Sequence, residues 1–166
     1  MRRFKTGAAF TAALLAVGGP IRAEPPEDAK AILEVGAAGE WGLNGGSSSY
    51  GPNIAFETTL IENWLEIEAS TTPFIHHSGT EWDTDFLFKK PYTLSRTVEF
   101  MAGVGPSWSH SRDGDHFGIE VAGDFMFWPW DKSRFGWYAE PSYGYSFAKG
   151  HERSLSLSIG LSIAVP

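Results

Sequence analysis

The chain has 166 residues, of which 42% are apolar, 14% aromatic and 20% charged, with a formal net charge of −7 and no cysteine. The length suits one domain, and the lack of cysteine excludes a disulfide scaffold, a cysteine-ligated zinc site and a thiol nucleophile. No window holds the roughly 20 apolar residues that a membrane-spanning helix needs, and with 20 acidic against 13 basic residues we expect no nucleic-acid binding.

The first 23 residues have the layout of a secretory signal peptide. A basic start, residues 1–5, precedes an apolar stretch, residues 7–19, and Pro20 lies shortly before the small residue Ala23. Removal of residues 1–23 takes away four basic residues and changes the net charge from −7 to −11. Residues 24–30 read as an extended acidic lead-in with no core of its own. The folded domain is therefore expected to span residues 31–166.

After the lead-in, apolar and polar residues alternate with period two, which is typical of β-strands with one apolar face. In the first half of the domain the alternation is found in residues 33–41, 54–60, 65–70 and 82–89. In the second half it is more regular, in residues 97–108, 117–127, 135–147 and 155–165. The sequence predicts an all-β domain, an eight-stranded antiparallel up-and-down barrel.

Alternation alone does not say whether the apolar face points into the lumen, as in a soluble ligand-binding barrel, or toward lipid. The polar face consists largely of Ser, Gly, Ala and carboxylates, with very little Lys. Small residues suit the narrow interior of an eight-stranded barrel better than they suit a solubilising outer surface. We therefore favour a transmembrane barrel and keep a soluble periplasmic barrel that binds an apolar ligand as the alternative.

The tryptophans also favour the membrane. All of them lie near the ends of the predicted strands, and the amphipathic indole ring prefers the membrane–water interface. The predicted interface aromatics are Trp41, Trp64, Trp82, Trp108, Trp128, Trp130 and Trp137.

The connections between the predicted strands fall into two sets that alternate along the chain. Three short turns, residues 61–64, 90–95 and 129–133, are placed at one end of the barrel. Four polar and on average longer loops, residues 42–51, 76–81, 109–116 and 148–153, are placed at the other. Short periplasmic turns and longer external loops are typical of outer-membrane barrels.

From Ala31 to Val165 the chain resembles the small eight-stranded outer-membrane barrels, the group that contains the OmpA transmembrane domain and OmpX. The resemblance rests on the overall pattern and on Val98–Pro106 and Arg134–Tyr143, which are similar to stretches of uncharacterised outer-membrane proteins from proteobacteria. It implies a place in the Gram-negative cell outer membrane. It also implies lipopolysaccharide, the barrel-assembly machinery and periplasmic chaperones as partners, and it brings no catalytic motif.

With the apolar face outward, the predicted lumen is acidic, and Lys89 is the one basic residue assigned to it, near one end. The carboxyl groups form a hydrogen-bonded network with Tyr138, serines and water, or alternatively attract or bind a cation. Free conduction is not expected, because side chains fill the interior of an eight-stranded barrel. The predicted lumen carboxylates are Glu34, Glu40, Glu57, Glu66, Glu68, Asp83, Asp85, Glu99, Glu120, Asp124 and Glu140.

All five histidines, His76, His77, His110, His116 and His151, lie in the predicted longer loops. Solvated loop histidines are the favoured interpretation. A metal site at this rim is the alternative, because imidazole and carboxylate together suit zinc, copper or nickel. Its candidate ligands are His110, Asp113, Asp115 and His116.

A second alternative is a barrel enzyme that modifies lipid A with a serine and a histidine near the external rim. The candidate groups are His110 with Ser109 or Ser111, and His151 with Ser154 and Glu152. Adjacent residues of a regular strand point to opposite faces, so Ser109 and His110 could not pair there. The sequence therefore predicts a non-enzymatic, monomeric outer-membrane barrel with a structural or surface-interaction role and no cofactor.

Overall fold

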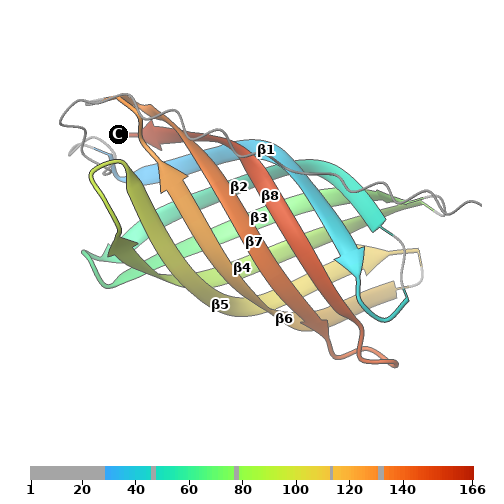
Figure 1. Ribbon diagram of the computed structural model, residues 1–166. Helices are drawn as coiled ribbons and strands as arrows, with labels where there is room; N and C mark the ends of the chain where they lie inside the picture. Colours follow the sequence, from blue (N-terminus) through green and yellow to red (C-terminus); the bar gives the residue numbers. More distant parts are fainter. Residues whose placement is uncertain (1–28, 46–47, 77–78, 113, 131–132) are drawn as a thin grey trace, which may run out of the picture.

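Eight β-strands make up most of the chain in the computed structural model, which describes residues 29–45, 48–76, 79–112, 114–130 and 133–166 (Figure 1). The predicted signal peptide, residues 1–23, lies outside the described residues, as does most of the acidic lead-in. Among the described residues, no helix is long and apolar enough to cross a membrane. The strands are β1 (Ala31–Gly42), β2 (Ser48–Ile61), β3 (Leu65–His76), β4 (Gly79–Thr93), β5 (Val98–Ser111), β6 (Gly114–Phe127), β7 (Phe135–Ser146) and β8 (Arg153–Val165).

The strands form one closed antiparallel barrel in which each pairs with the next along the chain. The last strand, β8, closes the barrel on β1, with Ala31 opposite Val165. Figure 1 shows the strong tilt of the strands, which closing a sheet of this size requires. The predicted all-β, eight-stranded up-and-down barrel is confirmed.

The two faces of the wall differ as the alternation predicts. Along β2, Phe56 is 50% exposed on the outer face, whereas its neighbour Glu57 is 1% exposed in the interior. The same alternation continues through the other strands, so large apolar side chains lie outside and Ser, Gly, Ala and carboxylates lie inside. The inward placement of the polar face follows from space, since eight large side chains at one level could not fit together inside.

The strands are longer than predicted and the connections differ accordingly. We call the end with the β2–β3, β4–β5 and β6–β7 connections the turn end, and the opposite one the loop end. At the loop end, β3 continues to His76 and β4 begins at Gly79, and β5 continues to Ser111 and β6 begins at Gly114. The predicted loops 76–81 and 109–116 are therefore too long, and the connections at the loop end are not longer on average than those at the turn end. The polar residues of these two predicted loops still pair across the ladder, as His110 does with Asp115, so the strands extend through them.

The turn end of the interior is filled by an apolar plug. Met101, Met126 and Trp128 are each no more than 1% exposed. Trp128 directly follows β6 in the inward register of Met126, so its predicted place among the interface aromatics is wrong. The plug consists of Ile32, Met101, Met126, Trp128, Tyr138 and Ala164.

Two glycines face each other at the seam where β8 closes the barrel on β1. Gly36 is paired with Gly160, and Tyr138 of β7 is the neighbour of Gly160 on the other side. A Cβ atom on Gly36 would lie 2.1 Å from the carbonyl oxygen of Ile159 and 2.6 Å from the Tyr138 hydroxyl oxygen. The missing side chains therefore let the seam strands approach and leave room for the tyrosine ring.

Gly36→Ala should destabilise the barrel by about 1–3 kcal/mol, the usual range for overpacking, because the new methyl group meets backbone and the Tyr138 hydroxyl. Gly39→Ala is the matched control on the same strand, since its Cβ would first meet the ring of Trp41, at 3.3 Å. Urea unfolding of the detergent-folded protein, followed by tryptophan fluorescence, measures both. Equal stability of the two variants would contradict this role of Gly36.

Candidate functional site

Lys89 lies at the centre of the acidic interior. Its side chain is fully buried, and its Nζ atom contacts the carboxylates of Glu57 at 3.4 Å, Asp124 at 3.1 Å and Glu140 at 2.6 Å. It also donates a hydrogen bond to Glu68. These partners come from β2, β3, β6 and β7, so one ammonium group joins opposite walls of the barrel.

The sequence makes room for this lysine on the neighbouring strand. Lys89 is paired with Gly103 of β5, and a Cβ atom on that glycine would lie 2.9 Å from Cγ of Lys89. Gly103 therefore relieves crowding, and the long lysine side chain can extend into the lumen.

The ammonium group also relieves a repulsion that the register creates. Glu57 and Glu68 are directly opposite each other in the β2–β3 ladder, and like charges in such a pair are destabilising. Lys89 contacts both. Glu34 adds a further carboxylate, which lies close to those of Glu68 and Asp124. We call Glu34, Glu57, Glu68, Asp124 and Glu140 the carboxylate cluster.

Neutral side chains around the cluster supply further hydrogen bonds. Ser162 donates to Oε1 of Glu34 at 3.2 Å. The Tyr138 hydroxyl donates to Asn53 at 2.8 Å, and the Asn53 amide donates to Thr72 at 2.9 Å. Of the predicted network partners, Ser162 donates to a carboxylate, whereas the hydrogen bond of Tyr138 leads to the neutral side chains of Asn53 and Thr72. Because Tyr138 also belongs to the apolar plug, it joins the plug to the polar interior.

The cluster nevertheless retains buried oxygen atoms without a hydrogen-bond partner. They include Oε1 of Glu57, Oε1 of Glu68 and Oδ1 of Asp124. Asp85, two strand positions above Leu87 on the inner face of β4, has one such oxygen as well. Buried polar atoms are normally paired, so these oxygens need a proton, a water molecule or a cation.

A cavity of about 490 Å³ opens above the cluster at the loop end. Its walls carry the carboxylates of Glu40, Glu81, Asp83, Glu120 and Glu152. They also carry His116 and Arg153, which leaves the cavity with an acidic balance. The interior therefore has three levels, which are the apolar plug, the carboxylate cluster and the loop-end cavity.

The predicted lumen carboxylates are distributed over these levels. Glu40, Asp83 and Glu120 line the loop-end cavity, and Asp85 lies below them on β4. Glu66 is in the turn-end part of β3, where it accepts a hydrogen bond from Thr59 at 3.2 Å, and Glu99 is near the turn-end start of β5. Sequence reasoning placed Lys89 inside but missed its contacts with four strands, because alternation carries no information about partners across the barrel.

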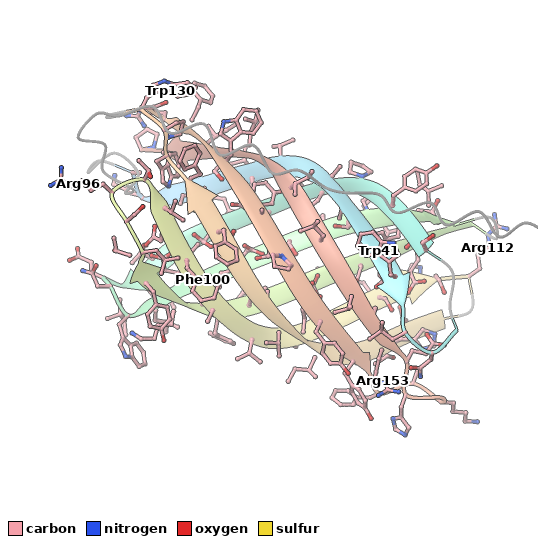
Figure 2. The ribbon with its side chains drawn as sticks, in the orientation of Figure 1. Trp41, Arg96, Phe100, Arg112, Trp130 and Arg153 are labelled. Atoms are coloured by element: carbon pink, nitrogen blue, oxygen red, sulfur yellow. The ribbon has the colours of Figure 1, made fainter. Side chains whose placement is uncertain are left out.

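The other predicted interface tryptophans lie on the outside. Figure 2 shows Trp41 toward the loop end, where Arg112 and Arg153 also lie, and Trp130 toward the turn end, where Arg96 also lies. Their side chains are between 42% and 62% exposed. These outward tryptophans are Trp41, Trp64, Trp82, Trp108, Trp130 and Trp137.

The structure divides the predicted rim metal site between two faces. His110 donates from Nδ1 to Asp115 at 2.7 Å, and Trp108 donates to the same carboxylate at 3.2 Å. These hydrogen bonds, that from His110 above all, lower the pKa of the exposed Asp115. His116 instead lines the loop-end cavity, and Asp113 lies outside the described residues.

The histidines proposed for lipid A chemistry have other partners. His110 is paired with Asp115, as above, and Nδ1 of His151 is hydrogen-bonded to the Tyr145 hydroxyl at 3.0 Å. The Nδ1 atom of each histidine is therefore hydrogen-bonded to a carboxylate or to a tyrosine hydroxyl. A nucleophile–base pair needs a serine hydroxyl within hydrogen-bond distance of the histidine.

Lys89→Met should destabilise the barrel by about 3–5 kcal/mol at neutral pH, because it leaves buried carboxylates without their counter-charge. The loss should shrink on acidification, since protonated carboxyl groups need no ammonium partner. Lys90→Met is the matched control, because Lys90 lies on the outer side, with its Nζ 5.5 Å from the centre of the Tyr92 ring. Unfolding midpoints in urea between pH 5 and pH 8 test this, and an equal effect of both substitutions at all pH values would refute it.

Comparisons with known proteins agree with the fold. No family model matches the sequence, and no curated protein is similar to it in sequence. The structure is similar to that of Neisserial surface protein A, with a TM-score of 0.64 and 14% identity over 81% of this chain and 96% of that protein. It is also similar to OprG from Pseudomonas aeruginosa, with a TM-score of 0.61 and 10% identity over 85% of this chain and 98% of that one. It is similar as well to Ail, the attachment invasion locus protein of Yersinia pestis, with a TM-score of 0.56 and 12% identity over 82% of this chain and 99% of that one. The chain therefore has the fold of the small eight-stranded outer-membrane barrels.

Proposed function

We propose that this protein is a monomeric, non-enzymatic barrel of the Gram-negative outer membrane with a structural or surface-interaction role. Lipopolysaccharide surrounds it, and periplasmic chaperones and the barrel-assembly machinery deliver it. The fold shared with Neisserial surface protein A, OprG and Ail supports this assignment.

The observation that carries the proposal is the apolar outer face. Thirty-one large apolar side chains of the described residues are more than a third exposed, and 26 of them lie in strands, with at least one from each of the eight. Soluble monomers rarely expose contiguous apolar patches larger than a few hundred Å². An apolar wall that surrounds the molecule, with tryptophans toward both ends, suits a lipid environment.

The interior argues against the soluble alternative. A soluble barrel for an apolar ligand needs an apolar lumen. Here the apolar plug closes the turn end, and the loop-end cavity is lined by carboxylates such as Asp83 and Glu120.

The surface role is assigned to the loop end. The β3–β4 and β5–β6 hairpins continue there as paired strands to His76 and Ser111. Two of the similar structures are those of a Neisserial surface protein and of an attachment invasion locus protein. Contact with other cells or with envelope components is the corresponding proposal for this chain.

Val104→Lys tests the membrane assignment. Val104 lies in the middle of β5 on the outer face, between Phe88 and Val121 of the neighbouring strands. In a bilayer this lysine should cost about 2–4 kcal/mol, whereas Leu60→Lys near the turn end should cost about 0–1 kcal/mol. Unfolding from phospholipid vesicles, followed by tryptophan fluorescence, measures both. Equal costs, together with a detergent-free monodisperse monomer, would favour the soluble barrel.

We also expect a barrel closed to free ion flow, because the apolar plug and the Lys89 ion pairs cross the lumen. Pure protein in planar bilayers should show no conductance steps. Open, cation-selective steps would contradict this closure.

The lipid A alternative is tested separately, since overexpression of a modifying enzyme would change the mass spectrum of lipid A.

A further inference from the structure

We propose that the barrel interior binds one divalent cation of the calcium class, held by Glu34, Glu68 and Asp124. The inference goes beyond the proposed function, because a structural or surface-interaction barrel needs no ion. It rests on the arrangement of the ligand atoms, on buried oxygens without partners, and on the acidic path that leads to them.

The three carboxylates have the spacing of a cation site. Each offers one oxygen atom, and these atoms lie within 4.8 Å of one another. Calcium binds oxygen ligands at about 2.3–2.6 Å, so three oxygen atoms this close to one another can bind one ion. Magnesium needs shorter bonds and near-octahedral geometry, and transition metals prefer nitrogen or sulfur ligands. An all-carboxylate set favours calcium, because the coordination geometry of calcium is more flexible than that of magnesium.

Two of the three proposed ligand residues also have buried oxygens that a cation could bind. Glu68 and Asp124 are 1% and 0% exposed, and each uses one oxygen to accept a hydrogen bond from Lys89. The second oxygen of each, Oε1 of Glu68 and Oδ1 of Asp124, has no hydrogen-bond partner. Lys89 therefore orients these carboxylates without satisfying them, and one oxygen on each stays available to a cation.

The cluster contains more carboxyl groups than the one ammonium group can pair with. Its five carboxylates surround the single ammonium group of Lys89, which leaves a formal charge of −4 when all are ionised. Buried charges are unfavourable unless they are paired or bound to a metal. In the ionised form of the cluster a divalent cation would halve this excess, since the one charge of Lys89 is already shared among four carboxylates.

The loop-end cavity offers the ion a way in. Asp83 lines that cavity, and Asp85 follows on the inner face of the same strand with one unpartnered oxygen of its own. Lys89 comes four residues later on that face, which corresponds to about 13 Å along a strand. The apolar plug closes the opposite end. Entry is therefore expected from the loop end along carboxylate oxygens.

Calcium binding to the full chain folded in detergent tests the proposal, with calcium chloride as the probe in calorimetric titrations. We expect one ion per chain for the wild type and at least about tenfold weaker binding for Glu34→Gln, which loses a charged ligand. Glu34 accepts a hydrogen bond from Ser162, and the ion pairs of Lys89 within the described residues are with the other four carboxylates, so this variant keeps the lysine contacts. Heat-modifiable migration on gels confirms that it folds.

Asp83→Asn is the matched control, because it removes a carboxylate of the loop-end cavity and leaves the three ligands in place. It should keep the stoichiometry and the affinity within about twofold of wild type, as a change outside the ligand set. Weaker binding of magnesium chloride than of calcium chloride would support the site as well. An absence of heat at millimolar calcium, or binding that survives Glu34→Gln and is lost in Asp83→Asn, would overturn the proposal.

Discussion

The ammonium group of Lys89 holds the inner architecture together, because it contacts carboxylates on strands from both sides of the barrel. Without it, the directly opposed Glu57 and Glu68 would repel each other in the ladder that joins β2 to β3. The residues around it serve the same end, since Gly103 leaves space for its side chain. Between the apolar plug and the loop-end cavity, the narrow interior is filled by the side chain of Lys89 and its carboxylate partners.

The outer and inner faces of the wall answer different demands. Outside, side chains such as Phe100 and Val104 need only be apolar, because they face the surroundings of the barrel and meet no opposite wall. Inside, each side chain meets the opposite wall, so Gly36, Gly160 and Tyr138 must fit one another closely. The effect of a substitution on stability therefore depends on polarity at an outer position, and on shape and charge at an inner one.

Most of the fold was predictable from the sequence, and the interior arrangement was not. Period-two alternation identifies the strands and their faces because side chains of a strand point alternately to its two sides. It fails at the ends: polar residues from Ser109 to His116 read as a loop although they pair across a hairpin. Trp128 was assigned to the membrane interface because it lies near a strand end, but residues near a strand end can face either the interface or the apolar plug. The partners of Lys89 depend on closure and register, which no local pattern encodes.

The seam between β1 and β8 sets the order in which such a barrel can form. Every other pairing joins neighbours along the chain, so those hairpins close short segments. The seam alone among these pairings brings together residues as far apart as Ala31 and Val165. Loop-closure entropy grows with the length of chain enclosed, and contacts between distant residues slow folding. Closure at the two glycines is therefore expected last, as the slow step that turns a curved sheet with two free edges into a barrel with none.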